Sequence, residues 1–197
     1  MATLSYVKII KDKHLLRLGI AEGEECAAYT VTESVYADIG RPLRGESLDG
    51  ESLLIIKRAD SYYRAKKKAL LLLAYADNSE RSLAAKLRRA GFPRDIAEEA
   101  VREMVGLGYI NEEASLERLI VSEANVKLHG PGKILPHLSA KGYSSGSIKR
   151  VLTRLVESGE IDLTRNAKAL VDRKLGADPD REERLELLYK YGYKIRD

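Results

Sequence analysis

The sequence predicts a mostly helical fold built from tandem three-helix repeats, preceded by a small β meander with short helices. A motif that ends in glycine and an aromatic residue recurs at Gly91-Phe92, Gly142-Tyr143 and Gly192-Tyr193, so its glycines lie 51 and 50 residues apart. A second motif repeats with the same spacing, since Gly108 and Ile110 are matched by Gly159 and Ile161. A fixed period with matching ends is typical of repeat proteins.

Each repeat is expected to hold three helices. In the first repeat the helices are predicted near 61–76, 79–90 and 94–107, and in the second near 112–129, 132–141 and 145–158. In the third repeat only two are predicted, near 163–175 and 179–191. The glycines of both motifs fall where a left-handed residue ends a helix. We therefore expect the third repeat to be truncated after its second helix.

The third helix of the second repeat has the clearest amphipathic pattern. Its apolar stripe consists of Ile148, Val151, Leu152, Leu155 and Val156. This spacing places Lys149, Arg150 and Arg154 on the opposite face, where we expect them to be exposed. On the equivalent helix of the first repeat, Ile96, Ala100, Met104 and Leu107 mark the buried side, and Glu98, Glu99, Arg102 and Glu103 are expected to face outward.

The first third of the chain has a different periodicity. Alternating runs over residues 4–10, 14–20 and 27–31 predict three short antiparallel strands, with turns at Asp12-Lys13 and Glu22-Gly23-Glu24. Short helices are predicted after Thr32 and after Asp49, although residues 52–56 could equally form a strand. The expected division is 1–58, 59–110, 111–161 and 162–197, with residues 1–58 as a separate and dispensable element.

Several function classes are disfavoured by the composition. A single cysteine, Cys26, allows no internal disulfide and suits a reducing cytoplasm. The longest apolar run, residues 69–76, is far shorter than the roughly 20 residues that a membrane span needs. His14, His129 and His137 lack metal-ligand spacing, and Gly130-Pro131-Gly132-Lys133 lacks the spacing of a phosphate-binding loop. We therefore expect a non-enzymatic protein without a metal or other cofactor.

The charge distribution points to a binding surface. The net charge is only +4, yet residues 81–94 and 124–156 contain no acidic residue. Such segments are typical of surfaces that bind polyanions or acidic partners, although a solvated basic face is the simpler explanation. The candidate residues are Arg81, Lys86, Arg88, Arg89, Arg94, Lys133, Lys141, Lys149, Arg150 and Arg154.

Over residues 61–197 the chain resembles the RecX family, bacterial regulators of the RecA recombinase. The resemblance rests on the order and spacing of the segments 86–92, 107–111 and 129–134, followed by Leu138 and Lys141-Gly142-Tyr143. It implies three tandem repeats in a curved rod that inserts into the groove of a RecA–DNA filament. It further implies restraint of strand exchange, ATP hydrolysis and co-protease activity. We expect a monomer that binds single-stranded and double-stranded DNA only weakly.

A DNA-binding module of the helix-turn-helix kind is the alternative, because glycine-joined short helices resemble that motif. Against it, no helix begins with the cluster of Asn, Gln and Arg that a recognition helix uses to contact bases.

Overall fold

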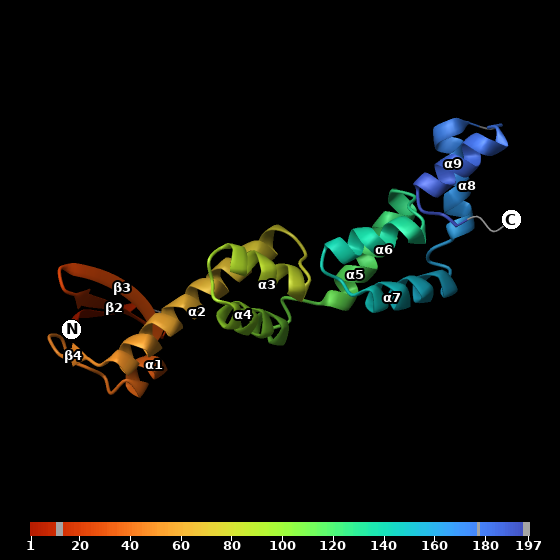
Figure 1. Cartoon of the computed structure of the whole chain (residues 1–197). Helices are drawn as coiled ribbons and strands as arrows, with labels where there is room; N and C mark the ends of the chain where they lie inside the picture. The colour runs from red at the N-terminus through yellow and green to blue at the C-terminus, as the bar shows by residue number, and fades with distance from the viewer. Residues whose placement is uncertain (11–13, 177, 195–197) are drawn as a thin grey trace. The chain divides into compact units, whose positions relative to one another are not determined.

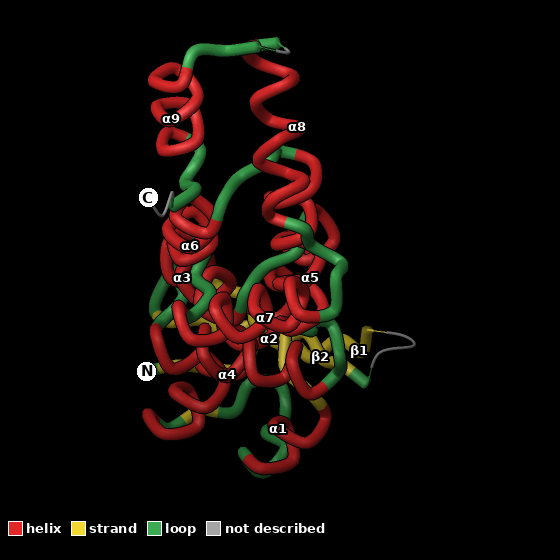
Figure 2. Tube along the Cα trace, turned by 90° about the vertical axis from the view of Figure 1, so that its right-hand side faces the viewer, coloured by secondary structure: helices red, strands yellow, loops and turns green. Residues whose placement is uncertain are grey.

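A computed structural model of the chain describes residues 1–10, 14–176 and 178–194 (Figure 1). Two compact units are present, one of residues 1–75 and 84–106 and the other of residues 76–83 and 107–197. The predicted fold class is confirmed, because the described chain is mostly helical behind an N-terminal antiparallel sheet (Figure 2). The predicted turn at Asp12-Lys13 lies outside the described residues.

The sheet of the first unit has four strands. The predicted meander is formed by β1 (Ala2–Ile10), β2 (Leu15–Glu22) and β3 (Glu25–Thr32), and a short β4 (Ser47–Leu48), which was not predicted, pairs with β1. All pairings are antiparallel in the order β3-β2-β1-β4. Helix α1 (Glu33–Asp38) follows with Thr32 as its N-cap, as predicted.

Helix α2 (Gly50–Tyr75) replaces two predicted elements. The short helix after Asp49 and the helix near 61–76 form one continuous helix, and the strand alternative for residues 52–56 is wrong. Ile56 is fully buried against the sheet, and the Asp60 carboxylate accepts a hydrogen bond of 2.9 Å from the backbone N–H of Thr30. The helix therefore runs through residue 58 and continues from the sheet into the first repeat. The four-part division of the chain stays a prediction.

The remaining helices follow the predicted repeats. The first repeat continues with α3 (Glu80–Arg89) and α4 (Arg94–Gly106). The second contains α5 (Glu112–Val121), which passes into a π-helical turn η1 (Ser122–Val126), then α6 (Pro131–Ala140) and α7 (Ser145–Glu157). Helices α8 (Leu163–Leu175) and α9 (Arg181–Lys190) correspond to the first two helices of a third.

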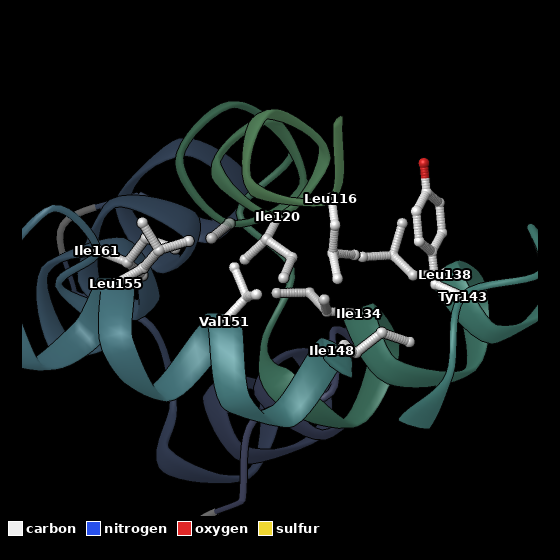
Figure 3. Close-up of a cluster of buried hydrophobic side chains, with 10 residues drawn as sticks. Leu116, Ile120, Ile134, Leu138, Tyr143, Ile148, Val151, Leu155 and Ile161 are labelled. Carbon is white, nitrogen blue, oxygen red and sulfur yellow. The ribbon is translucent and has the colours of Figure 1, made fainter. Parts of the chain in front are cut away.

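The core of the second repeat forms where the three apolar stripes meet. Figure 3 shows Val151 of α7 beneath Ile120 of α5 with Ile134 of α6 beside it, and Leu155 of α7 next to Ile161. Ile148, Val151 and Leu155 are buried as predicted, Leu152 is half-buried, and Val156 is exposed. The apolar spacing on α7 thus identified the face of the helix that enters the core.

Successive repeats in the second unit are connected by a contact between helix ends, called here the repeat joint. The N–H groups of Gly130 and Gly132 at the start of α6 donate to the carbonyls of Tyr191 and Gly192 after α9, at 2.8 and 2.9 Å. The first N–H groups and last carbonyls of a helix have no partner within the helix, so each end satisfies the other. Tyr193 adds a hydrogen bond of 3.1 Å from its hydroxyl to the carbonyl of Leu128.

The same joint occurs one repeat earlier. The Ser79 hydroxyl, just before α3, donates at 2.9 Å to the carbonyl of Lys141, just after α6. A side chain at Gly142 would place its Cβ 2.5 Å from this hydroxyl oxygen. The end of α6 therefore contacts the start of α3. In the same way, the end of α9 contacts the start of α6.

The buried carboxylate of Glu123 binds side chains on both sides of Gly130, where α9 meets α6. We call the contact between α9 and α6 the second repeat joint and the contact between α6 and α3 the first. Glu123 in η1 is 1% exposed and accepts hydrogen bonds from Lys127 Nζ at 2.6 Å and His129 Nδ1 at 2.7 Å. His137 Nδ1 on α6 lies 3.0 Å from the same carboxylate. Burial alone would raise the pKa of Glu123, but these three partners outweigh it and lower the pKa from 4.5 to about 2.

The bond between Asp60 and Thr30 should contribute measurably to the first unit. Asp60→Ala removes the acceptor of a half-buried N–H, so it should lower the free energy of unfolding by about 1–3 kcal/mol in denaturant titrations. Lys68→Ala, at an exposed position of the same helix, should change it by about 0.5 kcal/mol or less. Equal effects of the two variants would show that α2 is not held to the sheet through Asp60.

Glu123 predicts a specific acid sensitivity. Because its pKa is lower in the folded chain than in the unfolded chain, its stabilising contribution is complete above about pH 5 and is lost as the pH falls towards 2. The loss should be on the order of 3 kcal/mol, and Glu123→Gln should remove it while lowering stability at neutral pH. Urea titrations at several pH values measure both effects, with exposed Glu157→Gln as the control. A parallel pH dependence in parent and Glu123→Gln would contradict this assignment.

Candidate functional site

The ten candidate basic residues are divided between the two units. The first unit carries Lys86, Arg88, Arg89 and Arg94, and the second carries Arg81, Lys133, Lys141, Lys149, Arg150 and Arg154. Eight of them are exposed, whereas Lys86 and Lys133 are half-buried. Their value as binding groups depends on whether their charges are already compensated.

Helix α7 presents two uncompensated cations. Ser144 caps the helix by accepting a hydrogen bond of 3.0 Å from the N–H of Ser147, and the buried stripe then directs Lys149 and Arg150 outward. Neither side chain forms an ion pair with any residue that the structure describes. Both can therefore contact an anionic partner without first giving up an internal one.

Arg154 on the same helix has partners across the repeat. Its guanidinium lies 2.6 Å from the Glu117 carboxylate and 3.8 Å from that of Glu113, both on α5. All three side chains are substantially exposed, so the pairs contribute about 1 kcal/mol or less to stability. Arg154 is exposed as predicted, but the acids of α5 offset its charge.

The first repeat joint brings together two candidates that are far apart in the sequence. Arg81 lies in the first turn of α3 and Lys141 directly after α6. The Cβ of Arg81 is 3.5 Å from the position that a Cβ at Gly142 would occupy. Both side chains are exposed, and neither has an ion-pair partner in the described part of the chain. They form a second pair of available cations in the same unit as Lys149 and Arg150.

Two other candidates have local partners. The ammonium of Lys133 lies 4.6 Å from the centre of the Tyr191 ring, a cation–π contact that supports the second repeat joint. Arg94 pairs with Glu98 one turn along α4 at 2.7 Å, and this hydrogen bond raises the pKa of the guanidinium and lowers that of the carboxyl. Lys133 is thus better explained as a structural residue, and the charge of Arg94 is compensated.

Arg88 and Arg89 are exposed in the last turn of α3. Cations at this end of a helix interact favourably with the helix dipole. This interaction explains the two arginines without any binding function. They remain available for binding, but they belong to the first unit.

The predicted outward face of α4 is partly wrong. Glu103 accepts hydrogen bonds from Lys66 at 2.6 Å and from Tyr62, and Glu99 accepts one from Arg58 at 2.8 Å. These partners all lie on α2, which packs along α4 over a greater length than the sequence pattern indicated. The two glutamates therefore link two helices rather than face solvent.

One pair of exposed cations was missed. Lys67 and Lys68 on α2 are exposed and form no ion pair with described residues. The run of three lysines at 66–68 is the signal that could have identified them.

Within residues 1–10, 14–176 and 178–194, no group of three His, Cys, Asp or Glu side chains is arranged to hold a metal ion. Across the same residues, the structure contains no helix that is both long and apolar enough to cross a membrane.

Comparison with known proteins identifies relatives of this architecture. A family model described as the first three-helix domain of RecX matches residues 65–104, which include the C-terminal part of α2, all of α3 and most of α4. A regulatory protein RecX from Limosilactobacillus reuteri is 27% identical over 154 residues, covering 78% of this chain and 58% of the relative. Those from Clostridioides difficile and Geobacillus kaustophilus are 26% and 23% identical, covering 60% and 89% of this chain.

The chain spans 56 to 62% of the length of these three relatives. Among solved structures, a regulatory protein RecX is similar with a TM-score of 0.70 at 24% identity, covering 98% of this chain and 95% of the other. RecX from Lactobacillus salivarius gives a TM-score of 0.58 at 22% identity, covering 69% and 90%. At these identities the two structures show that the fold is shared.

The family model, the curated relatives and the solved structures all point to RecX proteins. This chain is therefore similar in sequence to RecX regulatory proteins, and it shares the fold of the solved RecX structures.

Proposed function

We propose that this chain is a non-enzymatic cytoplasmic regulator that binds the RecA–DNA filament and inhibits recombinase, ATPase and co-protease activity in DNA repair. The observation that carries the proposal is the pair of exposed cations without ion-pair partners on α7, in a chain that is similar to RecX proteins. We infer that Lys149 and Arg150 contact the filament, whose surface offers both DNA phosphate and acidic protein side chains.

Arg81 and Lys141 extend the proposed surface. They belong to the same compact unit, and the first repeat joint holds them close to each other. Four cations without internal partners can neutralise several anionic groups of a large partner, whereas binding to bare DNA through so few charges should be weak and sensitive to salt. The proposal therefore includes a preference for the filament over naked DNA, with the chain acting as a monomer.

Sequence-specific duplex binding is less well supported. Helix α7 would be the recognition helix of an α6–α7 pair, yet its first turn contains Ser145, Gly146 and Ser147. These residues cannot make the two-point contacts with base edges that Arg, Asn and Gln make. The α7 cations suit contacts with phosphates or carboxylates better.

The double variant Lys149→Glu with Arg150→Glu should weaken binding to RecA filaments on single-stranded DNA by about tenfold or more at physiological salt. It should raise the concentration needed to inhibit ATP hydrolysis to a similar extent. Stability should change by about 0.5 kcal/mol or less per site, because both positions are exposed. Filament co-sedimentation and an ATPase titration measure these effects.

The matched control is Lys168→Glu with Arg173→Glu, which makes the same change in charge at exposed positions of α8. It should regulate RecA as the parent does. If the α7 variant inhibits as well as the parent, the α7 surface is only a solvated face. Tight duplex binding that resists salt, without any effect on RecA, would favour the DNA-binding alternative.

A further inference from the structure

The first unit contains a groove between its sheet and α2 that the proposed function does not use. The β3–α2 groove has a volume of about 560 Å³, within the usual range of ligand sites. Its apolar walls are formed by Leu15 and Val31 of the sheet, Val35 of α1, and Ala59 and Leu70 of α2. Leu70 is 39% exposed, so apolar surface remains open to solvent along the groove.

Part of the groove is held rigidly. The Tyr62 hydroxyl, on one lining residue, donates a hydrogen bond of 2.5 Å to Glu103 on α4. The same carboxylate accepts a hydrogen bond of 2.6 Å from Lys66, a second lining residue. Burial and the neighbouring carboxylate raise the pKa of Tyr62 well above its usual range, so the hydroxyl stays a donor. The groove is therefore largely formed before any ligand binds.

Both charged residues that line the groove are lysines, and they differ in whether they already have an ion-pair partner. Lys66 is compensated by Glu103, whereas Lys67 lines the groove and has no ion-pair partner in the described part of the chain. None of the residues that line the groove is acidic. The groove thus offers apolar walls and one available ammonium group.

We propose that the β3–α2 groove binds a segment of a partner protein that presents large apolar side chains next to a carboxylate. The apolar side chains would lie against Val31, Ala59 and Leu70, and the carboxylate would pair with Lys67. A nucleic-acid strand fits less well, because its successive phosphates need several cations and the groove supplies one. This surface lies in the first unit and is independent of the basic residues assigned to the filament.

A short fluorescent peptide in which leucines alternate with aspartates provides the probe. Fluorescence anisotropy should show that the full-length chain binds it, and that a peptide with lysines in place of the aspartates binds at least tenfold more weakly. Lys67→Glu and Leu70→Asn should each weaken binding of the aspartate peptide by about tenfold. Lys67→Glu should also improve binding of the lysine peptide, since it reverses the charge at the groove.

Lys68→Glu and Leu71→Asn are matched controls, because they change the same residue types one position along α2 and do not line the groove. They should bind the aspartate peptide as the parent does, and circular dichroism should show that all four variants fold. The proposal is overturned if the parent fails to bind this peptide at millimolar concentration, or if the control variants weaken binding equally. Displacement of the peptide by single-stranded DNA would also overturn it. Loss of RecA regulation in the α7 variant is measured separately and does not bear on this groove.

Discussion

The contact between the end of one helix and the start of another organises the second unit. Where α9 meets α6, backbone N–H groups at the start of one helix donate to carbonyls after the other, and where α6 meets α3 the Ser79 hydroxyl donates to the carbonyl of Lys141. The approach is so close that Gly142 and Gly192 leave no room for a side chain. The position of Arg81 beside Lys141 is a direct result.

The repeats could be predicted because their signals are local. A left-handed glycine ends a helix wherever it occurs, and a spacing of three and four residues marks a buried face within one helix. The joint could not be predicted, because the partner of Gly142 lies at Ser79, in another repeat. The continuity of α2 could not be predicted either. Asp60 is a buried carboxylate on this helix, and it interrupts the apolar pattern that would have marked one continuous buried face. Asp60 is tolerated there because the N–H of Thr30 bonds it, and that contact becomes visible only once the sheet is in place.

For the candidate basic residues too, features set within one helix could be predicted, and contacts with other helices could not. The exposure of Lys149 and Arg150 followed from the apolar stripe on their own helix. The compensation of Arg154 by Glu117 and the stacking of Lys133 on Tyr191 did not, because both partners come from other helices. The ion pair between Arg94 and Glu98 could have been predicted from the sequence, because the two residues are four positions apart on one helix. The structure therefore narrows the proposed surface to the cations that no neighbouring helix neutralises.

The joint requires a glycine at position 142, beyond what the end of a helix alone requires. Gly91 and Gly142 have similar left-handed backbones, with φ of 91° and 97°, but a Cβ at Gly91 would meet no atom within 4 Å. Alanine should therefore cost about 1–2 kcal/mol of backbone strain at either site. Gly142→Ala should cost a further 1–3 kcal/mol or so, because the methyl group collides with Ser79. Denaturant unfolding of the two variants tests the claim most directly. A larger loss for Gly142→Ala supports the joint, and equal losses would contradict it.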